Sequence, residues 1–166
     1  MHSMGWLEQG GKASKNAYLE TGKFDNEDHR RFFRNQRDYF IDDQNRLFVH
    51  AGIDLALPMN EQDHKTFMWD RQMIRTVYEA WKANETPPKD VNGFKEIFIG
   101  HSNTVDHFTD LKPVNMFNVW NLDQGAKHFG KLTMMNVETK EYVQSDLVQE
   151  LYPEIELPKR LKRRPR

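Results

Sequence analysis

The sequence predicts an α/β domain. Three observations support this class: short runs of Phe, Ile, Leu and Val that stop beside a glycine, segments with helical spacing before and between those runs, and a length of 166 residues that suits one domain. In chain order the predicted elements are a helix, a strand, a second helix and four further strands. The sequence shows no internal repeat and no domain boundary.

The first predicted elements are a loop or short helix, a helix and a strand. Residues 5–23 show no sustained period. Asp25 offers an N-cap, and aromatic residues then recur at helical spacing, so a helix is expected over 26–40. A turn-forming cluster separates it from a short apolar strand over 46–50, which stops at a glycine.

A longer helix and four strands are predicted for the rest of the chain. The helix is expected over 62–84, because apolar residues recur at i, i+3, i+4 and i+7. These residues are Ile74, Val77, Tyr78 and Trp81. A second apolar strand follows over 94–99, and strict alternation over 114–122 predicts a strand with one solvated face. Residues 131–137 and 141–144 are expected to form a hairpin.

Composition excludes several classes of protein and site. Hydrophobic residues are 37% of the chain and aromatic residues 12%, which fits either a domain with an aromatic-rich core or a fragment that shares its core with a partner segment. There is no cysteine, so disulfides, zinc–thiolate sites and cysteine nucleophiles are excluded. The absence of a signal peptide and of a long apolar run predicts a cytoplasmic protein without a membrane segment.

Charge patterning points to no large anionic partner. The formal net charge is −1, so no global field steers the chain toward nucleic acid or membrane. Residues 153–166 form a basic tail that is expected to be disordered and solvated, with an anionic partner as the alternative. Nucleic acid is not an expected partner. The sequence also contains no nucleophilic triad, phosphate-cradling glycine loop or dinucleotide fingerprint.

Two histidines occupy matching positions. His50 and His101 each follow an apolar strand, and each lies beside a glycine or one residue from one. Two neighbouring strands that end this way can bring both imidazoles to about 2.0–2.1 Å from one metal ion. A structural role at a strand end is the alternative for either residue.

Arg71 is the candidate for contact with an anion. It is expected early in the long helix, where a guanidinium fork and free helical N–H groups suit phosphate oxygens. The alternative is a surface arginine paired with Asp70 or a nearby acid. A third segment, 123–126, resembles a turn-rich loop between strands, and its glycine can serve the turn alone.

Four segments resemble motifs of one enzyme family, in its order and spacing. They are similar to the VHAG strand end, the tryptophan–x–arginine segment, the GHT element and the LDTGA…GGKL segment of calcineurin-like metallophosphoesterases, of the bacterial and phage serine/threonine protein phosphatase or diadenosine-tetraphosphatase type. The segments are Phe48-Val49-His50-Ala51-Gly52-Ile53, Trp69-Asp70-Arg71, Ile99-Gly100-His101-Ser102, and Asn121-Leu122-Asp123-Gln124-Gly125-Ala126 with Gly130-Lys131-Leu132. The stretch with Trp6, Gly10-Gly11, Ser14 and Tyr18 resembles the one that follows the family's GNHD or GNHE motif.

The resemblance implies a fold, a reaction and site residues. It implies that residues 1–152 are the C-terminal portion of a metallophosphoesterase β-sandwich flanked by helices. The implied activity is metal-dependent hydrolysis of phosphate esters, in phosphoproteins or dinucleoside polyphosphates, with two divalent metal ions (manganese, iron or zinc). By resemblance, His50 and His101 ligate one metal and Arg71 binds the substrate phosphoryl group.

The sequence departs from the family pattern because it lacks several of the family's metal-binding motifs. The family's Asp-x-His, GDxxDRG and GNH(D/E) motifs do not occur in this sequence, and Gln124 replaces a usual threonine. The isolated chain is therefore expected to be inactive as a phosphatase, and a chain that supplies the N-terminal half of the domain is an expected partner. The alternative is a non-catalytic interaction domain that keeps part of the fold.

Overall fold

The computed structural model describes residues 7–86, 93–106, 108, 110–127 and 130–153. Trp6 and residues 154–166 of the basic tail lie outside the described residues. The chain separates into two compact units, residues 1–37 and 38–166, a boundary that no composition change in the sequence indicated. None of the described helices is long and apolar enough to span a membrane.

The first unit is helical. A π-helical turn (Leu7–Gly11) leads into α2 (Lys12–Glu20), and α3 (Glu27–Arg34) follows after a short loop. The Tyr18 hydroxyl lies 2.9 Å from His29 Nδ1, which connects the two helices. The N-cap of α3 is Asn26 rather than the predicted Asp25, because the Asn26 side chain accepts the backbone N–H of His29.

The predicted helix over 26–40 is wrong at its C-terminal end. The helix stops at Arg34, and Tyr39–Ile41 form strand β1 of the second unit. Phe40 had matched the helical period, yet it pairs with Phe48 of the neighbouring strand. Pairing with a strand that is distant in sequence overrides a local helical spacing, which is an expected failure of periodicity in short segments.

The second unit is built on a five-stranded mixed sheet in the order β1-β2-β3-β5-β4. Its strands are β1 (Tyr39–Ile41), β2 (Arg46–Val49), β3 (Glu96–Ile99), β4 (Val114–Met116) and β5 (Val119–Asn121). The three inner strands β2, β3 and β5 are parallel, and the two edge strands are antiparallel to their neighbours. The α/β class predicted from the sequence is therefore present.

The alternating segment 114–122 is a hairpin and not one strand. Strands β4 and β5 pair antiparallel, and Phe117 between them has a φ of 56°, in the left-handed region. Both halves of a hairpin keep the period of two, so alternation alone does not reveal the turn. The other predicted hairpin is confirmed as β6 (Thr133–Met135) and β7 (Tyr142–Gln144), with shorter strands.

The long predicted helix is broken in two. Helix α4 (His64–Trp69) ends at Asp70, whose ψ of 140° is extended, and α5 (Gln72–Lys82) starts after Arg71. The Asp70 carboxylate accepts the backbone N–H groups of Gln72 and Met73, at 3.1 and 2.9 Å. The break therefore has a cause: this carboxylate caps the second helix and turns the chain at Arg71. The remaining short helices are η2 (Met59–Glu61), η3 (Thr104–Asp106) and α6 (Val148–Leu151).

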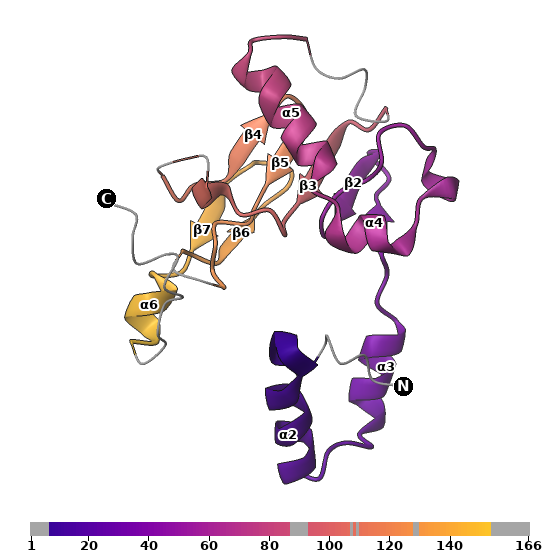
Figure 1. The fold of residues 1–166 in the computed structure, drawn as a ribbon, viewed down its shortest axis with the longest axis vertical. Helices are drawn as coiled ribbons and strands as arrows, with labels where there is room; N and C mark the ends of the chain where they lie inside the picture. Colours follow the sequence, from indigo (N-terminus) through magenta and orange to yellow (C-terminus); the bar gives the residue numbers. More distant parts are fainter. Residues whose placement is uncertain (1–6, 87–92, 107, 109, 128–129, 154–166) are drawn as a thin grey trace. The chain divides into compact units, whose positions relative to one another are not determined.

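One face of the sheet forms the hydrophobic core with α4 and α5 (Figure 1). Leu47, Ile97 and Val119 are fully buried at the centre of this face, one from each parallel strand. Met73 and Val77 of α5 are buried against the same cluster. The parallel strands thus have a well-packed base, which makes their ends rigid positions for side chains.

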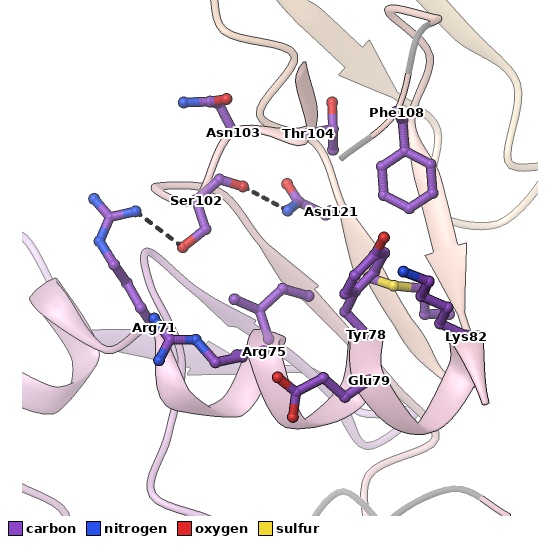
Figure 2. Close-up of a pocket in the computed structure, with 12 residues that line it drawn as sticks. Arg71, Arg75, Tyr78, Glu79, Lys82, Ser102, Asn103, Thr104, Phe108 and Asn121 are labelled. Carbon is purple, nitrogen blue, oxygen red and sulfur yellow. Dashed lines mark hydrogen bonds between the residues drawn. The ribbon is translucent and has the colours of Figure 1, made fainter. Parts of the chain in front are cut away.

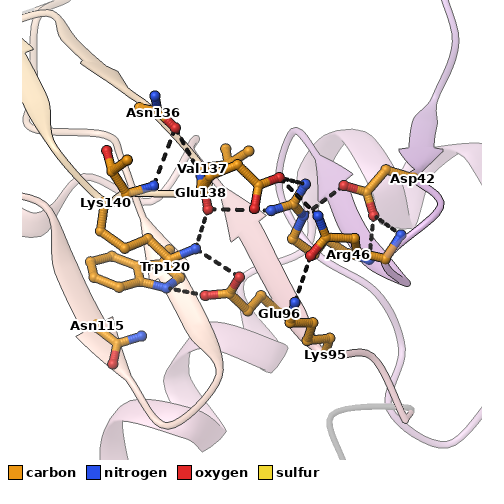
Figure 3. A network of polar contacts seen from close by, with 12 residues as sticks. Asp42, Arg46, Lys95, Glu96, Asn115, Trp120, Asn136, Val137, Glu138 and Lys140 are labelled. Atoms are coloured by element: carbon orange, nitrogen blue, oxygen red, sulfur yellow. Dashed lines mark hydrogen bonds and ion pairs between the residues drawn. The ribbon is translucent and has the colours of Figure 1, made fainter.

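The opposite face of the sheet carries a row of aromatic residues and a polar network. Phe48 and Phe98 stack at 5.0 Å, and Trp120 is the next residue of the row. The Lys140 amine, from the turn between β6 and β7, lies 5.2 Å from the Phe98 ring centroid and 2.7 Å from Glu96. These contacts bring the β6–β7 turn onto the sheet (Figure 3).

Arg46 is the buried member of that network, with 5% of its surface exposed. Its guanidinium contacts both Asp42 and Glu138 at 2.6 Å. The hydrogen bond from Arg46 lowers the pKa of Glu138 below its ordinary value. Both carboxylates are therefore charged at neutral pH, and the ion pairs link the start of β2 to the β6–β7 turn.

Candidate functional site

The candidate site lies at the carboxyl ends of the parallel strands. Strands β2, β3 and β5 point the same way, so the residues that follow them meet at one edge of the sheet. His50 follows β2, His101 follows β3 after one glycine, and Asp123 follows β5 after one residue. This edge is where open α/β sheets usually bind ligands.

The structure brings the two predicted histidines together. Their ring centroids are 4.9 Å apart, with the planes tilted by 58°. The Trp69 ring packs edge-on against His101 at 5.6 Å. Within the described part of the chain, His101 Nε2 is buried and has no hydrogen-bond partner. A buried nitrogen without a partner is costly, and a ligand or metal at that atom would relieve the cost.

The backbone at His101 is strained. Its φ is 61°, in the left-handed region that non-glycine residues rarely adopt. The preceding Gly100 donates its N–H to the carbonyl oxygen of His50 at 2.9 Å, which links the two strand ends directly. A strained residue that is held by such a link is a common feature of functional sites.

Gly52 and Gly100, the glycines near the two histidines, differ in how closely other atoms approach them. A Cβ on Gly52 would lie 2.7 Å from Asp70 Oδ2, so the close approach of the capping carboxylate requires glycine there. A Cβ on Gly100 would make only ordinary contacts, 3.7 Å from the His50 carbonyl oxygen. Close approach of a neighbouring group therefore requires glycine at Gly52 but not at Gly100.

Arg71 lies in the same place as the histidines. It is exposed, and its Nη1 donates to the hydroxyl of Ser102 at 3.3 Å. In the described residues no ion pair joins Arg71 to Asp70, so the surface-pair alternative is not observed. The Arg71 charge is also close enough to His101 to lower the pKa of that imidazole.

The expected helix N-terminal site at Arg71 is wrong in one respect. The backbone N–H groups of Gln72 and Met73 already bind the Asp70 carboxylate and are not available to a phosphate.

Asp123 also binds the backbone through its side chain, since its Oδ1 accepts the N–H of Gly125 at 2.9 Å. The two acidic residues near His101 therefore hold the backbone of the site through these bonds.

The loop after β5 has a structural role. Gln124 is 1% exposed, and its amide donates to the Asn121 carbonyl oxygen at 3.1 Å. Gly125 adopts a φ of 76°, and a Cβ on Gly130 would fall 1.6 Å from the Gln124 carbonyl oxygen. The glycines of this loop thus serve the turn and a close backbone crossing.

His101 is neutral over a wider pH range than an ordinary histidine. Its burial lowers the pKa of the imidazole below 6.5, and electrostatic interaction with Arg71 and with the neighbouring His50 lowers it further. The charges of Asp123 and Asp70 oppose this effect but do not cancel it. The neutral ring is the form that binds metal ions.

The lowered pKa of His101 predicts a pH dependence of stability. The unfolded chain takes up a proton at this position at a higher pH than the folded chain, so the free energy of unfolding falls as the pH drops through about 6.5 and levels off below the folded pKa. His101→Asn keeps a residue that tolerates positive φ and removes this group. Denaturant unfolding with a chelator present should show that the variant loses less stability than the native chain between about pH 7 and pH 5. An equal loss in both proteins would contradict the assignment.

A pocket of about 420 Å³ begins at Arg71 and follows α5 (Figure 2). Its walls are α5, the segment after β3 and the β4–β5 hairpin. Arg71 and Ser102 line one end, while Tyr78, Phe108 and Lys82 line the other. No pattern in the sequence indicates this pocket. The helical spacing of Arg71, Arg75 and Lys82 is visible in the sequence. The start of α5 directly after Arg71 is not, because a single unbroken helix was predicted.

Comparison with protein-family models and with curated proteins gives no match for this chain. Among the residues that the structure describes, no group of three or more His, Asp or Glu side chains is arranged to hold a metal ion. The site is therefore characterised by its own geometry: two close imidazoles, one arginine beside them and an adjoining pocket.

Proposed function

We propose that this chain supplies part of the active site of a metal-dependent phosphoesterase. His50 and His101 would ligate one divalent metal ion, and Arg71 would bind the substrate phosphoryl group. The observation that carries the proposal is the 4.9 Å separation of the two imidazoles, with the buried Nε2 of His101 free of any protein hydrogen bond in the described residues.

The donor set fits half of a metal site. Two rings at this separation can both reach one ion at about 2.0–2.1 Å, and neutral imidazoles suit zinc, iron and manganese to different degrees. A complete shell needs further oxygen ligands, which the described residues do not add. The proposal therefore includes a second segment, rich in carboxylates, which completes a site for two divalent ions, manganese, iron or zinc.

The protein groups have distinct roles in the proposed reaction. A bound pair of divalent ions would supply a nucleophilic hydroxide at neutral pH and neutralise charge on the phosphoryl oxygens. Arg71 would orient the phosphoryl group through its guanidinium fork and stabilise the charge that develops on it. Ser102 accepts a hydrogen bond from Arg71 and so restricts where the guanidinium lies.

The place of this chain in a larger domain is proposed from the resemblance of its motifs to those of calcineurin-like metallophosphoesterases. The five-stranded sheet and the β6–β7 hairpin would be the C-terminal portion of a metallophosphoesterase β-sandwich flanked by helices, over residues 1–152. The substrate would be a phosphate ester, in a phosphoprotein or a dinucleoside polyphosphate. A segment that carries the Asp-x-His, GDxxDRG and GNH(D/E) motifs would be the partner that completes the site.

A zinc titration followed through the histidine ring resonances tests the shared site. The His50 and His101 signals are expected to shift together, at one common Zn²⁺ concentration. In His50→Ala, the Zn²⁺ concentration that shifts the His101 signal should rise at least about tenfold. Even residues that only hydrogen-bond to a metal ligand contribute about 10- to 100-fold to metal affinity. His64→Ala is the control, since His64 is exposed and contacts Asp38 instead. Independent shifts of the two histidines, or a His101 response that is unchanged in His50→Ala, would show that they do not share an ion.

A further inference from the structure

We propose that the pocket along α5 binds the leaving group of the phosphate ester, and that this leaving group carries an aromatic ring. The inference rests on the proposed function, because it takes Arg71 as the residue that holds the phosphoryl group. It adds a binding site and a substrate feature, which follow from the shape, charge and lining of the pocket.

The pocket is continuous with the candidate phosphoryl site. Arg71 and Ser102 line it, whereas His50 and His101 do not. From Arg71 the lining continues along α5 to Lys82, eleven residues further, which is about 16 Å at the helical rise. A phosphoryl group held at Arg71 would therefore have the rest of its ester directed along this pocket. The volume of about 420 Å³ is in the range of small-molecule sites.

The charge of the lining favours an anionic ligand. Arg71, Arg75 and Lys82 outnumber the single acid Glu79. No ion pair joins these four side chains in the part of the chain that the structure describes. Arg75 lies one helical turn from Arg71, so both guanidinium groups can act on one phosphate or on a phosphate and a neighbouring anionic group.

The far end of the pocket suits a ring. Tyr78 and Phe108 pack edge-on at 5.8 Å, and Ile74 and Met116 add aliphatic surface. The Lys82 amine lies 6.0 Å from the Tyr78 ring centroid (Figure 2). An aromatic ligand can pack edge-on against such rings.

The wall after β3 adds hydrogen-bonding capacity. The side-chain oxygens of Asn103 and Thr104 are buried and have no protein partner in the described residues. Both residues line the pocket, and Thr104 is 2% exposed. A polar substituent on the leaving group could satisfy one of these groups.

Binding of three phosphates to the full chain tests this inference. Inorganic phosphate, methyl phosphate and phenyl phosphate are titrated and followed by calorimetry and by the methyl signals of Ile74 and Met116. Phenyl phosphate is expected to bind at least about tenfold more tightly than methyl phosphate, because its ring is buried in the pocket. Only phenyl phosphate should shift the two methyl signals strongly.

Variants separate the ring contact from the phosphate contact. Tyr78→Leu should reduce the preference for phenyl phosphate over methyl phosphate. Arg75→Gln should weaken the binding of all three ligands and leave the fold intact, because Arg75 is exposed. Lys65→Gln is the control, because Lys65 is exposed on α4 and does not line the pocket.

The outcomes distinguish this inference from the proposed function. Equal affinity for methyl and phenyl phosphate, with binding that is lost in Arg71→Gln, would overturn the aromatic pocket and leave the phosphoryl role of Arg71 standing. A phenyl preference that survives in Tyr78→Leu without shifts of Ile74 and Met116 would place the ring elsewhere and also overturn the inference. Absence of binding by all three ligands would count against both.

Discussion

Leu47→Ala is expected to lower the free energy of unfolding by about 2–5 kcal/mol, the range for a fully buried leucine in a close-packed core. Leu47 is 0% exposed, in the middle of β2 and between β1 and β3. The truncation removes buried apolar surface and leaves a cavity that parallel strands cannot readily close. Denaturant unfolding with an unchanged m-value would measure the loss.

The matched control is a leucine of the β6–β7 region. Leu132 is 63% exposed, so Leu132→Ala should change the free energy of unfolding by less than about 0.5 kcal/mol. A loss below about 1 kcal/mol in Leu47→Ala would mean that the core face of the sheet is not packed as described. Because β2 ends at Val49 and His50 follows it directly, the same variant is also expected to loosen the candidate site.

The positions of the two histidines at the ends of strands were predictable from the sequence. His50 and His101 each follow an apolar strand, and parallel pairing of β2 with β3 puts both strand ends at one edge. The sequence shows the strands and the histidines but not the pairing, which is decided by contacts about 50 residues apart. The structure supplies that pairing, and with it the 4.9 Å separation of the rings.

Other features were hidden because their signals are not periodic. Phe40 matched a helical spacing although it lies in strand β1, and the break at Asp70 depends on one carboxylate that caps α5. The turn at Phe117 uses a positive φ at a bulky residue, which turn statistics do not favour. The α5 pocket needs side chains from three separate segments, so no single stretch of sequence could indicate it.

The most direct test of the proposed function is phosphatase activity after completion of the site. This chain would be joined behind a segment that carries the Asp-x-His, GDxxDRG and GNH(D/E) motifs of the resembled family, and turnover of 4-nitrophenyl phosphate measured with Mn²⁺. The chain alone should show no metal-dependent turnover, since two imidazoles without bridging carboxylates form an incomplete site.

In the joined protein Arg71 is expected to matter most. Arg71→Ala should lower kcat/KM about 10²- to 10³-fold, the usual loss for one preorganised donor to transition-state charge. Arg71→Lys should recover only part of this, because an ammonium group lacks the planar fork. Lys65→Ala, on the exposed surface of α4, should leave kcat/KM unchanged.

The decisive comparison is therefore the Mn²⁺-dependent kcat/KM of the joined protein, of its Arg71→Ala variant and of the chain alone. Turnover is expected in the joined protein only, with the stated loss on removal of Arg71. A joined protein that folds but shows no metal-dependent turnover, an Arg71→Ala variant with undiminished kcat/KM, or strong turnover by the chain alone would contradict it. The first of these results would favour a non-catalytic interaction domain.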